Sequence, residues 1–260
     1  MSSWRLTKET PTLATEARRG ILWTARYGPN IRTEEVADMP RFESMFTAPC
    51  SMPNGLQATD EGIWMVDQET DDVLLVDGDG RAVRRLKTET ENGSGIAYGD
   101  GALWLGSNGP ATFREKRPTD REGKYILKVD PHSGATLAAY PLEGPGGVHG
   151  VEWAEGMLWV TRPGVKVIEQ YGLSDFSIVR KIPSPLPRSH GLAWVDGALW
   201  CVYTADRVIV KQDPTDGKVL ERIEVPEPNP EPHGLTLWQG QLIYCDATSD
   251  QKGQVWRVVL

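Results

Sequence analysis

A unit of roughly 40–45 residues recurs five times between Asn54 and the C-terminus, a period typical of repeat folds. Each copy starts with a polar residue, a Gly and an apolar residue, and continues through a tight Gly-containing turn into a short apolar run. Two β-type runs joined by such a turn form a hairpin. The leading polar residues of the five copies are Asn54, Ser94, His149, His190 and His233.

Two further β-type runs complete most copies, for example 208–213 and 218–223 in the fourth copy. Four short strands per repeat of this length indicate a β-propeller blade. The last copy ends after its third run, Val255–Val259. We therefore expect an N-terminal segment, Ser3–Thr7 or Gly20–Arg26, to supply the fourth strand and close the ring. The predicted fold is an all-β propeller of five blades, or of six if residues 1–53 contain a degenerate blade.

Two segments interrupt the repeat. Residues 16–53 are predicted to form an N-terminal helical or loop segment. Within it, residues 33–46 are expected to form a short helix interrupted at Pro40. Residues 107–124 are a loop insertion between the second and third runs of the second copy. In a propeller this connection lies on the same face as the leading residues, so the insertion is expected over the channel mouth, as a lid, a substrate rim or a solvated loop. Residues 1–260 are predicted to form a single domain.

Composition narrows the possible partners. The net charge of −8 argues against a nucleic-acid partner. No apolar stretch is long enough to span a membrane, and the N-terminus lacks the apolar core of a secretory signal. Cys50, Cys201 and Cys245 are expected to be reduced thiols, and most tryptophans to pack between blades. These features predict a cytoplasmic protein with a small-molecule substrate, no nucleic-acid partner and no membrane partner; they leave the oligomeric state open.

The leading position carries the sharpest chemistry. The first strand of each blade lines the central channel, so His149, His190 and His233 should meet at its mouth, opposite Asn54 and Ser94. Three imidazoles with an open side resemble a catalytic metal site, and imidazole suits zinc or iron better than magnesium or calcium. We therefore predict one divalent transition metal, with zinc or iron favoured. A metal-free acid–base or substrate-binding cluster and a purely structural role remain alternatives.

The second runs return to the same face and end at five different residues, namely Asp67, Ser107, Arg162, Tyr203 and Asp246. A carboxylate there could orient an imidazole or act as a base. Arg162 could bind a substrate carboxylate, and Tyr203 could move a proton if a nearby cation lowers its pKa. Glu152 has no acidic counterpart in the other copies and is a possible ligand, base or buried partner of Arg162. The predicted catalytic residues are Glu152, Tyr203, Arg162, Asp246 and Asp67, and the predicted substrate-binding residues are Asn54, Ser94 and Asn108. His132, in an outer turn, is expected to be uninvolved.

Over residues 54–260 the pattern x-Gly-Leu, Gly-x-Leu-Trp, Asp-x-x-Gly resembles the small enzymatic propellers related to virginiamycin B lyase, SMP-30/gluconolactonase and NHL-type propellers. Virginiamycin B lyases open a cyclic depsipeptide by metal-assisted elimination. The histidine set is also similar to that of the peptidyl-α-hydroxyglycine amidating lyase, which implies Tyr203 as base and Arg162 as substrate clamp beside a zinc ion. The five-bladed glutaminyl cyclotransferases are similar in size, but we do not find their Phe-Thr-x-Gly-Leu opening.

The resulting hypothesis is a metal-dependent lyase or hydrolase that acts on a small organic substrate at the channel mouth. A three-histidine iron oxygenase-type enzyme is the enzymatic alternative. A propeller that binds a ligand or a protein without catalysis is the non-enzymatic alternative.

Overall fold

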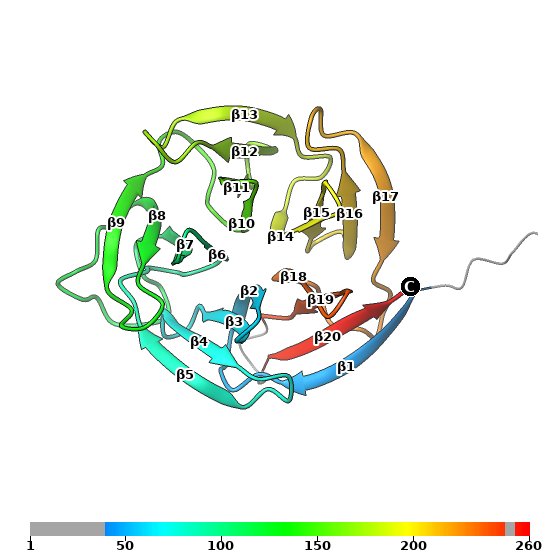
Figure 1. Ribbon diagram of the computed structural model, residues 1–260, viewed down its shortest axis with the longest axis horizontal. Coiled ribbons are helices and arrows are strands. Elements are labelled where there is room, and N and C mark those ends of the chain that lie inside the picture. The colour runs from blue at the N-terminus through cyan, green and yellow to red at the C-terminus, as the bar shows by residue number, and fades with distance from the viewer. Residues whose placement is uncertain (1–39, 248–252) are drawn as a thin grey trace, which may run out of the picture. The chain divides into compact units, whose positions relative to one another are not determined.

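The described part of the chain forms a ring of five β-sheets. The computed structural model describes residues 40–247 and 253–260. They belong to one compact unit. Each sheet has four antiparallel strands, and the sheets stand radially around a central axis (Figure 1). The predicted five-bladed all-β propeller is confirmed.

The strand bounds follow the repeat. Blade 1 comprises β2 (Pro53–Thr59), β3 (Gly62–Asp67), β4 (Asp72–Val76) and β5 (Ala82–Lys87). Blade 2 comprises β6 (Ile96–Gly99), β7 (Ala102–Asn108), β8 (Lys124–Val129) and β9 (Thr136–Pro141). Blade 3 comprises β10 (Val151–Ala154), β11 (Met157–Arg162), β12 (Val167–Tyr171) and β13 (Ile178–Pro183). Blade 4 comprises β14 (Ser189–Val195), β15 (Ala198–Tyr203), β16 (Val208–Gln212) and β17 (Val219–Glu224). Blade 5 comprises β18 (Leu235–Trp238), β19 (Gln241–Cys245), β20 (Gln254–Val259) and β1 (Arg41–Thr47).

An N-terminal strand closes the ring, but it is not one of the two segments expected. The donor is β1, which pairs antiparallel with β20 from Arg41↔Val259 to Thr47↔Gln254. Both Ser3–Thr7 and Gly20–Arg26 lie outside the described residues. The helix expected over 33–46 is wrong for residues 41–46, because the open edge of β20 offers unpaired N–H and C=O groups that an extended strand satisfies. Residues 33–39 also lie outside the described part.

The glycine of each repeat lets the inner strands touch. A Cβ on Gly95 would stand 2.1 Å from the carbonyl oxygen of His149, and a Cβ on Gly150 would stand 2.1 Å from that of His190. A Cβ on the equivalent glycines Gly55, Gly191 and Gly234 would also meet a backbone atom, at 2.6, 2.3 and 2.8 Å. The space left between the inner strands is a cavity of about 10 Å³, close to the volume that one water needs. The channel is therefore closed beneath the leading residues.

Tryptophans pack between the blades, as expected. Trp104 of blade 2 stacks on Trp153 of blade 3, with ring centroids 5.9 Å apart, and Trp159 of blade 3 stacks on Trp194 of blade 4 at 6.3 Å. All three cysteines are free and buried. The described ranges hold no helix with the length and apolarity to cross a bilayer.

Candidate functional site

Three consecutive blades bring their histidines into contact at the channel mouth. His149 lies two residues before β10 and His233 lies two residues before β18, whereas His190 lies within β14. The ring centroids of His149 and His190 are 4.1 Å apart, and those of His190 and His233 are 4.9 Å apart. The two Nδ1 atoms of His149 and His190 are separated by 3.3 Å. We call these three residues the histidine cluster, and the face of the ring that bears them the histidine face.

Burial keeps the histidine cluster neutral. His190 lies in the middle and is 3% exposed, whereas His149 and His233 are half-buried. Burial, followed by the positive charge of Arg188, lowers the pKa of His149 and of His233 to about 4. Burial also holds the pKa of His190 well below its ordinary value. Among residues 40–247 and 253–260, Nε2 of His190 and Nδ1 of His233 are buried and find no hydrogen-bond partner, which costs free energy.

The cluster fits a metal in part. Two nitrogens bound at 2.0–2.1 Å to a tetrahedral metal lie about 3.3 Å apart, which matches the Nδ1 separation of His149 and His190. Within residues 40–247 and 253–260, however, no three His, Cys, Asp or Glu side chains converge as a metal-binding group. The first two predicted ligands thus have ligand spacing, and His233 joins them by ring contact alone.

Two of the predicted substrate-binding residues position His149 instead of facing an open site. The Val148 N–H donates to the side-chain Oδ1 of Asn108 at 2.6 Å, and the side-chain Nδ2 of Asn108 donates to the Val148 carbonyl oxygen. The Ser94 hydroxyl donates to the same Val148 oxygen. Both side chains therefore fix the peptide next to His149. Asn54, the third such residue, donates to Gln68 Oε1 at 2.8 Å.

Arg162 also positions the approach to His149. Its guanidinium pairs with Glu169 at 2.8 Å and donates to the carbonyl oxygens of Gly147, Glu143 and Pro145. These bonds hold the loop 143–147 that leads into the histidine. Because Arg162 is deeply buried and bound to protein atoms, it is not poised as a substrate clamp. The alternative that Glu152 pairs with Arg162 is wrong, since the carboxylate on Arg162 belongs to Glu169.

The remaining predicted catalytic residues serve turns and core contacts. Tyr203 is fully buried, donates to Gln212 Oε1 at 2.9 Å and accepts from Ser184 at 3.1 Å. Burial raises its pKa, the reverse of the lowering that a proton-transfer role would require. The Asp67 carboxylate accepts the Met52 N–H and the Thr70 hydroxyl, and that of Asp246 accepts the Gln254 N–H.

Glu152 occupies a register that links one blade to the next. Its buried carboxyl contacts the backbone N–H of Trp194 in the following blade, and burial raises its pKa to about 8. At the equivalent position Gln57 accepts the Tyr98 N–H at 3.3 Å, and Thr236 accepts the Ala58 N–H at 3.0 Å. Glu152 lies three residues beyond His149 on the inner strand, or about 10 Å along an extended chain. It is a neutral inter-blade acceptor in this structure.

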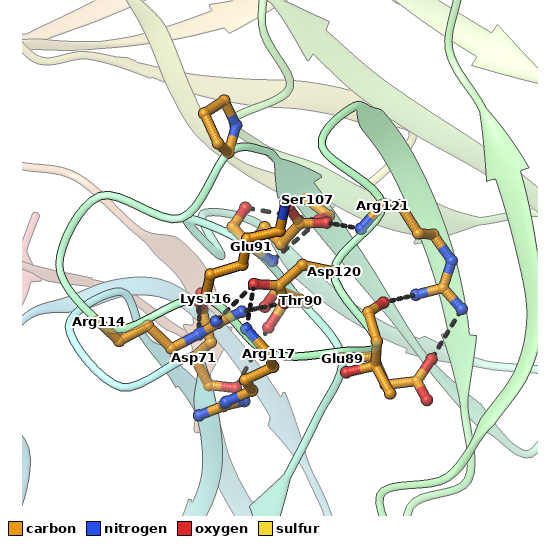
Figure 2. A network of polar contacts seen from close by, with 12 residues as sticks. Asp71, Glu89, Thr90, Glu91, Ser107, Arg114, Lys116, Arg117, Asp120 and Arg121 are labelled. Carbon is orange, nitrogen blue, oxygen red and sulfur yellow. Dashed lines mark hydrogen bonds and ion pairs between the residues drawn. The ribbon is translucent and has the colours of Figure 1, made fainter.

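The insertion is braced against blades 1 and 2. Arg114 bridges Asp71 at 2.7 Å and Asp120 at 2.8 Å, while Arg121 pairs with Glu89 at 2.7 Å (Figure 2). The backbone N–H of Arg121 donates to the carboxylate of Glu91 at 2.6 Å. These contacts fix the insertion to the loop before β6.

Glu91 and Asn108 connect the braced insertion to the histidine cluster. The Asn108 N–H donates to the Glu91 carbonyl oxygen at 2.6 Å, and the Asn108 side chain holds Val148. Glu91 therefore links the insertion, through Asn108, to the peptide preceding His149. This relay was not anticipated from the sequence.

Arg188 is the functional candidate that the sequence reasoning missed. It is exposed, and its positive charge lowers the pKa of every member of the histidine cluster. The sequence could have indicated Arg188 by its position, two residues before His190.

Together these observations define a five-bladed β-propeller with a histidine cluster at the mouth of a closed channel. No protein-family model matches the chain, and no curated protein matches its sequence. Among solved structures it is similar to glutaminyl cyclase from Myxococcus xanthus, with a TM-score of 0.62 and 14% identity over 85% of this chain and 96% of that one.

Two further structures are similar in fold. One is a catalytically inactive histidine-to-alanine variant of virginiamycin B lyase from Staphylococcus aureus with quinupristin, at a TM-score of 0.51 and 18% identity over 81% of this chain and 67% of that one. The other is a luciferin-regenerating enzyme, at a TM-score of 0.52 and 12% identity over 85% and 95%. At these identities the likeness establishes the propeller fold alone.

Proposed function

We propose that the protein is a metal-dependent enzyme, a lyase or a hydrolase, that acts on a small organic substrate at the histidine cluster. The observation that carries the proposal is the contact of three neutral imidazoles from consecutive blades at one mouth of the ring. Neutral imidazole is the form that ligates a transition metal. Ligation through Nδ1 of His233 would also satisfy a buried ring nitrogen that has no hydrogen-bond partner within the described residues.

His149 and His190 would hold the metal through their Nδ1 atoms, and His233 would complete the set. Zinc or iron suits these donors, and such a metal, when bound, polarises a carbonyl or lowers the pKa of water. Asn108 and Arg162 would keep the imidazole of His149 in place by holding the backbone before it. The closed channel would restrict water and substrate to the histidine face.

The structural neighbours favour an enzyme over a binding propeller. The glutaminyl cyclase, the virginiamycin B lyase and the luciferin-regenerating enzyme are propellers that carry enzymatic activity. The inactive lyase has one histidine replaced by alanine, so a histidine is linked to activity in that protein. A binding propeller has no comparable use for three imidazoles that are packed together and kept neutral.

Elemental analysis of untagged protein, desalted without chelator, tests the proposal. We expect about one equivalent of zinc or iron, as in a mononuclear site. The metal should be lost in His149→Ala and retained in His132→Ala, which changes an exposed outer turn. Zinc would direct the substrate search to lactones and other elimination or hydrolysis substrates, and iron to oxygenation. A metal-free protein that also fails to bind added zinc would overturn the metal dependence.

A further inference from the structure

Arg188 stands at the rim of the histidine cluster. It directly precedes β14 and lies two residues before His190. The Thr204 N–H donates to the Arg188 carbonyl oxygen at 3.3 Å, which anchors the backbone at this point. The guanidinium is exposed and close enough to influence the charge state of all three imidazoles.

Arg188 differs from the other arginines of the histidine face, which are committed to protein partners. Ion pairs with carboxylates or hydrogen bonds to backbone carbonyls engage Arg114, Arg117, Arg121, Arg162 and Arg207. Within the described residues, the guanidinium of Arg188 makes neither an ion pair nor a hydrogen bond. A cation without a partner among the described residues thus lies beside a neutral cluster.

We propose that the molecule bound at the histidine cluster carries a carboxylate, and that Arg188 binds this group. The inference rests on the proposed function, because it names the substrate class of that same site. The planar guanidinium matches a carboxylate through two parallel N–H···O bonds. A phosphate dianion would call for a second free cation or a cradle of backbone N–H groups, whereas one guanidinium balances one carboxylate.

A carboxylate beside His233 sets the orientation of the ligand. Oε2 of Glu231 lies 4.0 Å from Nε2 of His233. A bound anion would be repelled from this side and attracted toward Arg188. The carboxylate of the ligand therefore points to Arg188, and its uncharged reacting part lies over the histidine cluster. The protein's net charge of −8 makes a local cation necessary for attracting an anion to this face.

Titrating acetate and inorganic phosphate at constant ionic strength, with the imidazole NMR signals as readout, tests the proposal. Acetate should shift the signals of the histidine cluster in the full-length protein. Arg188→Met, which keeps the length but removes the charge, should weaken acetate binding about tenfold or more, and Arg188→Lys should restore part of it. Arg222→Met removes the same charge from an exposed outer strand and should bind acetate as the parent does.

The results separate this inference from the proposed function. Acetate binding that Arg188→Met leaves unchanged, an absence of acetate-induced shifts, or tighter binding of phosphate than of acetate would each overturn the carboxylate assignment. A protein that binds zinc but behaves in this way would keep its proposed function and lose only the inference. A metal-free protein that binds acetate through Arg188 would keep the inference and lose the metal dependence.

Discussion

Nδ1 of His149 and Nδ1 of His190 lie 3.3 Å apart, although the residues are 41 positions apart in the sequence and belong to different blades. Two neutral imidazoles that face each other through the same type of atom must share one proton or share one cation. With both rings held neutral, the pair is an electron-rich centre at the mouth of the ring. This pair and the ring that holds it lead to five measurable expectations.

Replacing His190 with Ala should remove the central imidazole and with it metal retention and activity together. Without metal, the free energy of unfolding should change little, because the substitution removes a buried ring nitrogen that has no hydrogen-bond partner within the described residues. With metal, the parent alone should gain stability by mass action. Thermal unfolding with and without chelator measures both effects. Full metal content in His190→Ala would contradict this assignment.

Stability should fall as the pH drops from about 6.5 to about 4. In this window the unfolded chain protonates its histidines, while His149 and His233, with a pKa of about 4, remain neutral in the folded protein. Each contributes at most about 1.4 kcal/mol per pH unit, and less where solvent reaches the ring. Urea unfolding at several pH values in the presence of chelator, compared with His149→Gln, measures the term. An identical pH dependence in the variant would show that His149 does not contribute.

Glu152→Gln should stabilise the protein at alkaline pH. The folded state keeps the Glu152 proton up to a pKa of about 8, whereas the unfolded chain releases it near 4.5, so stability is lost as the pH rises between these values. Gln can accept the Trp194 N–H as Gln57 accepts that of Tyr98. We expect a gain on the order of 2–4 kcal/mol at pH 9 and little change at pH 4. Lower stability of the variant at pH 9 would indicate that the ionised carboxylate has a favourable partner.

Asn108→Ala should weaken metal binding without removing a ligand. The Asn108 side chain holds both polar groups of the Val148 backbone, and loss of such supporting bonds lowers metal affinity about 10–100-fold. Chelator competition measures the affinity. Asn229→Ala, which loses only a bond within an exposed loop, should match the parent. Equal affinities in the two variants would remove the positioning role of Asn108.

Gly150→Ala should destabilise the ring. The new Cβ would stand 2.1 Å from the His190 carbonyl oxygen, so two inner strands must separate, at a cost of about 1–3 kcal/mol or more. Gly172→Ala is the matched control, because its Cβ would meet only a side-chain atom of Val179 at 3.3 Å. Urea unfolding compares the two, and equal stabilities would show that the tight approach can relax.

Repetition made most of the fold predictable. The recurring turn and strand pattern gave the blades their order, and the absence of a fourth run after Val255–Val259 required a donor from elsewhere. The choice of donor was not predictable, because β1 has no repeat signature. Its strand state comes from pairing with β20, a contact between residues more than 200 positions apart.

The site was predictable only where register alone determines position. The leading residue of each blade must face the channel mouth, and this brings the three histidines together. The partners of Arg162 and Tyr203 come from neighbouring strands and loops, so their use in ion pairing and core packing was hidden in the sequence. Arg188 was not predictable either. Its guanidinium is distinguished by having no partner within the described residues, and a sequence does not show which side chains remain unpaired.

The glycines bring the inner strands into contact, so the channel is closed beneath the histidine cluster. No molecule can pass between the inner strands, so whatever enters from the histidine face must leave by the same opening. A product that keeps the charged group of its substrate would then compete with the next substrate for the same opening. Under the proposed function, turnover would be sensitive to accumulated product, and the rate at which product leaves the mouth would set its upper limit.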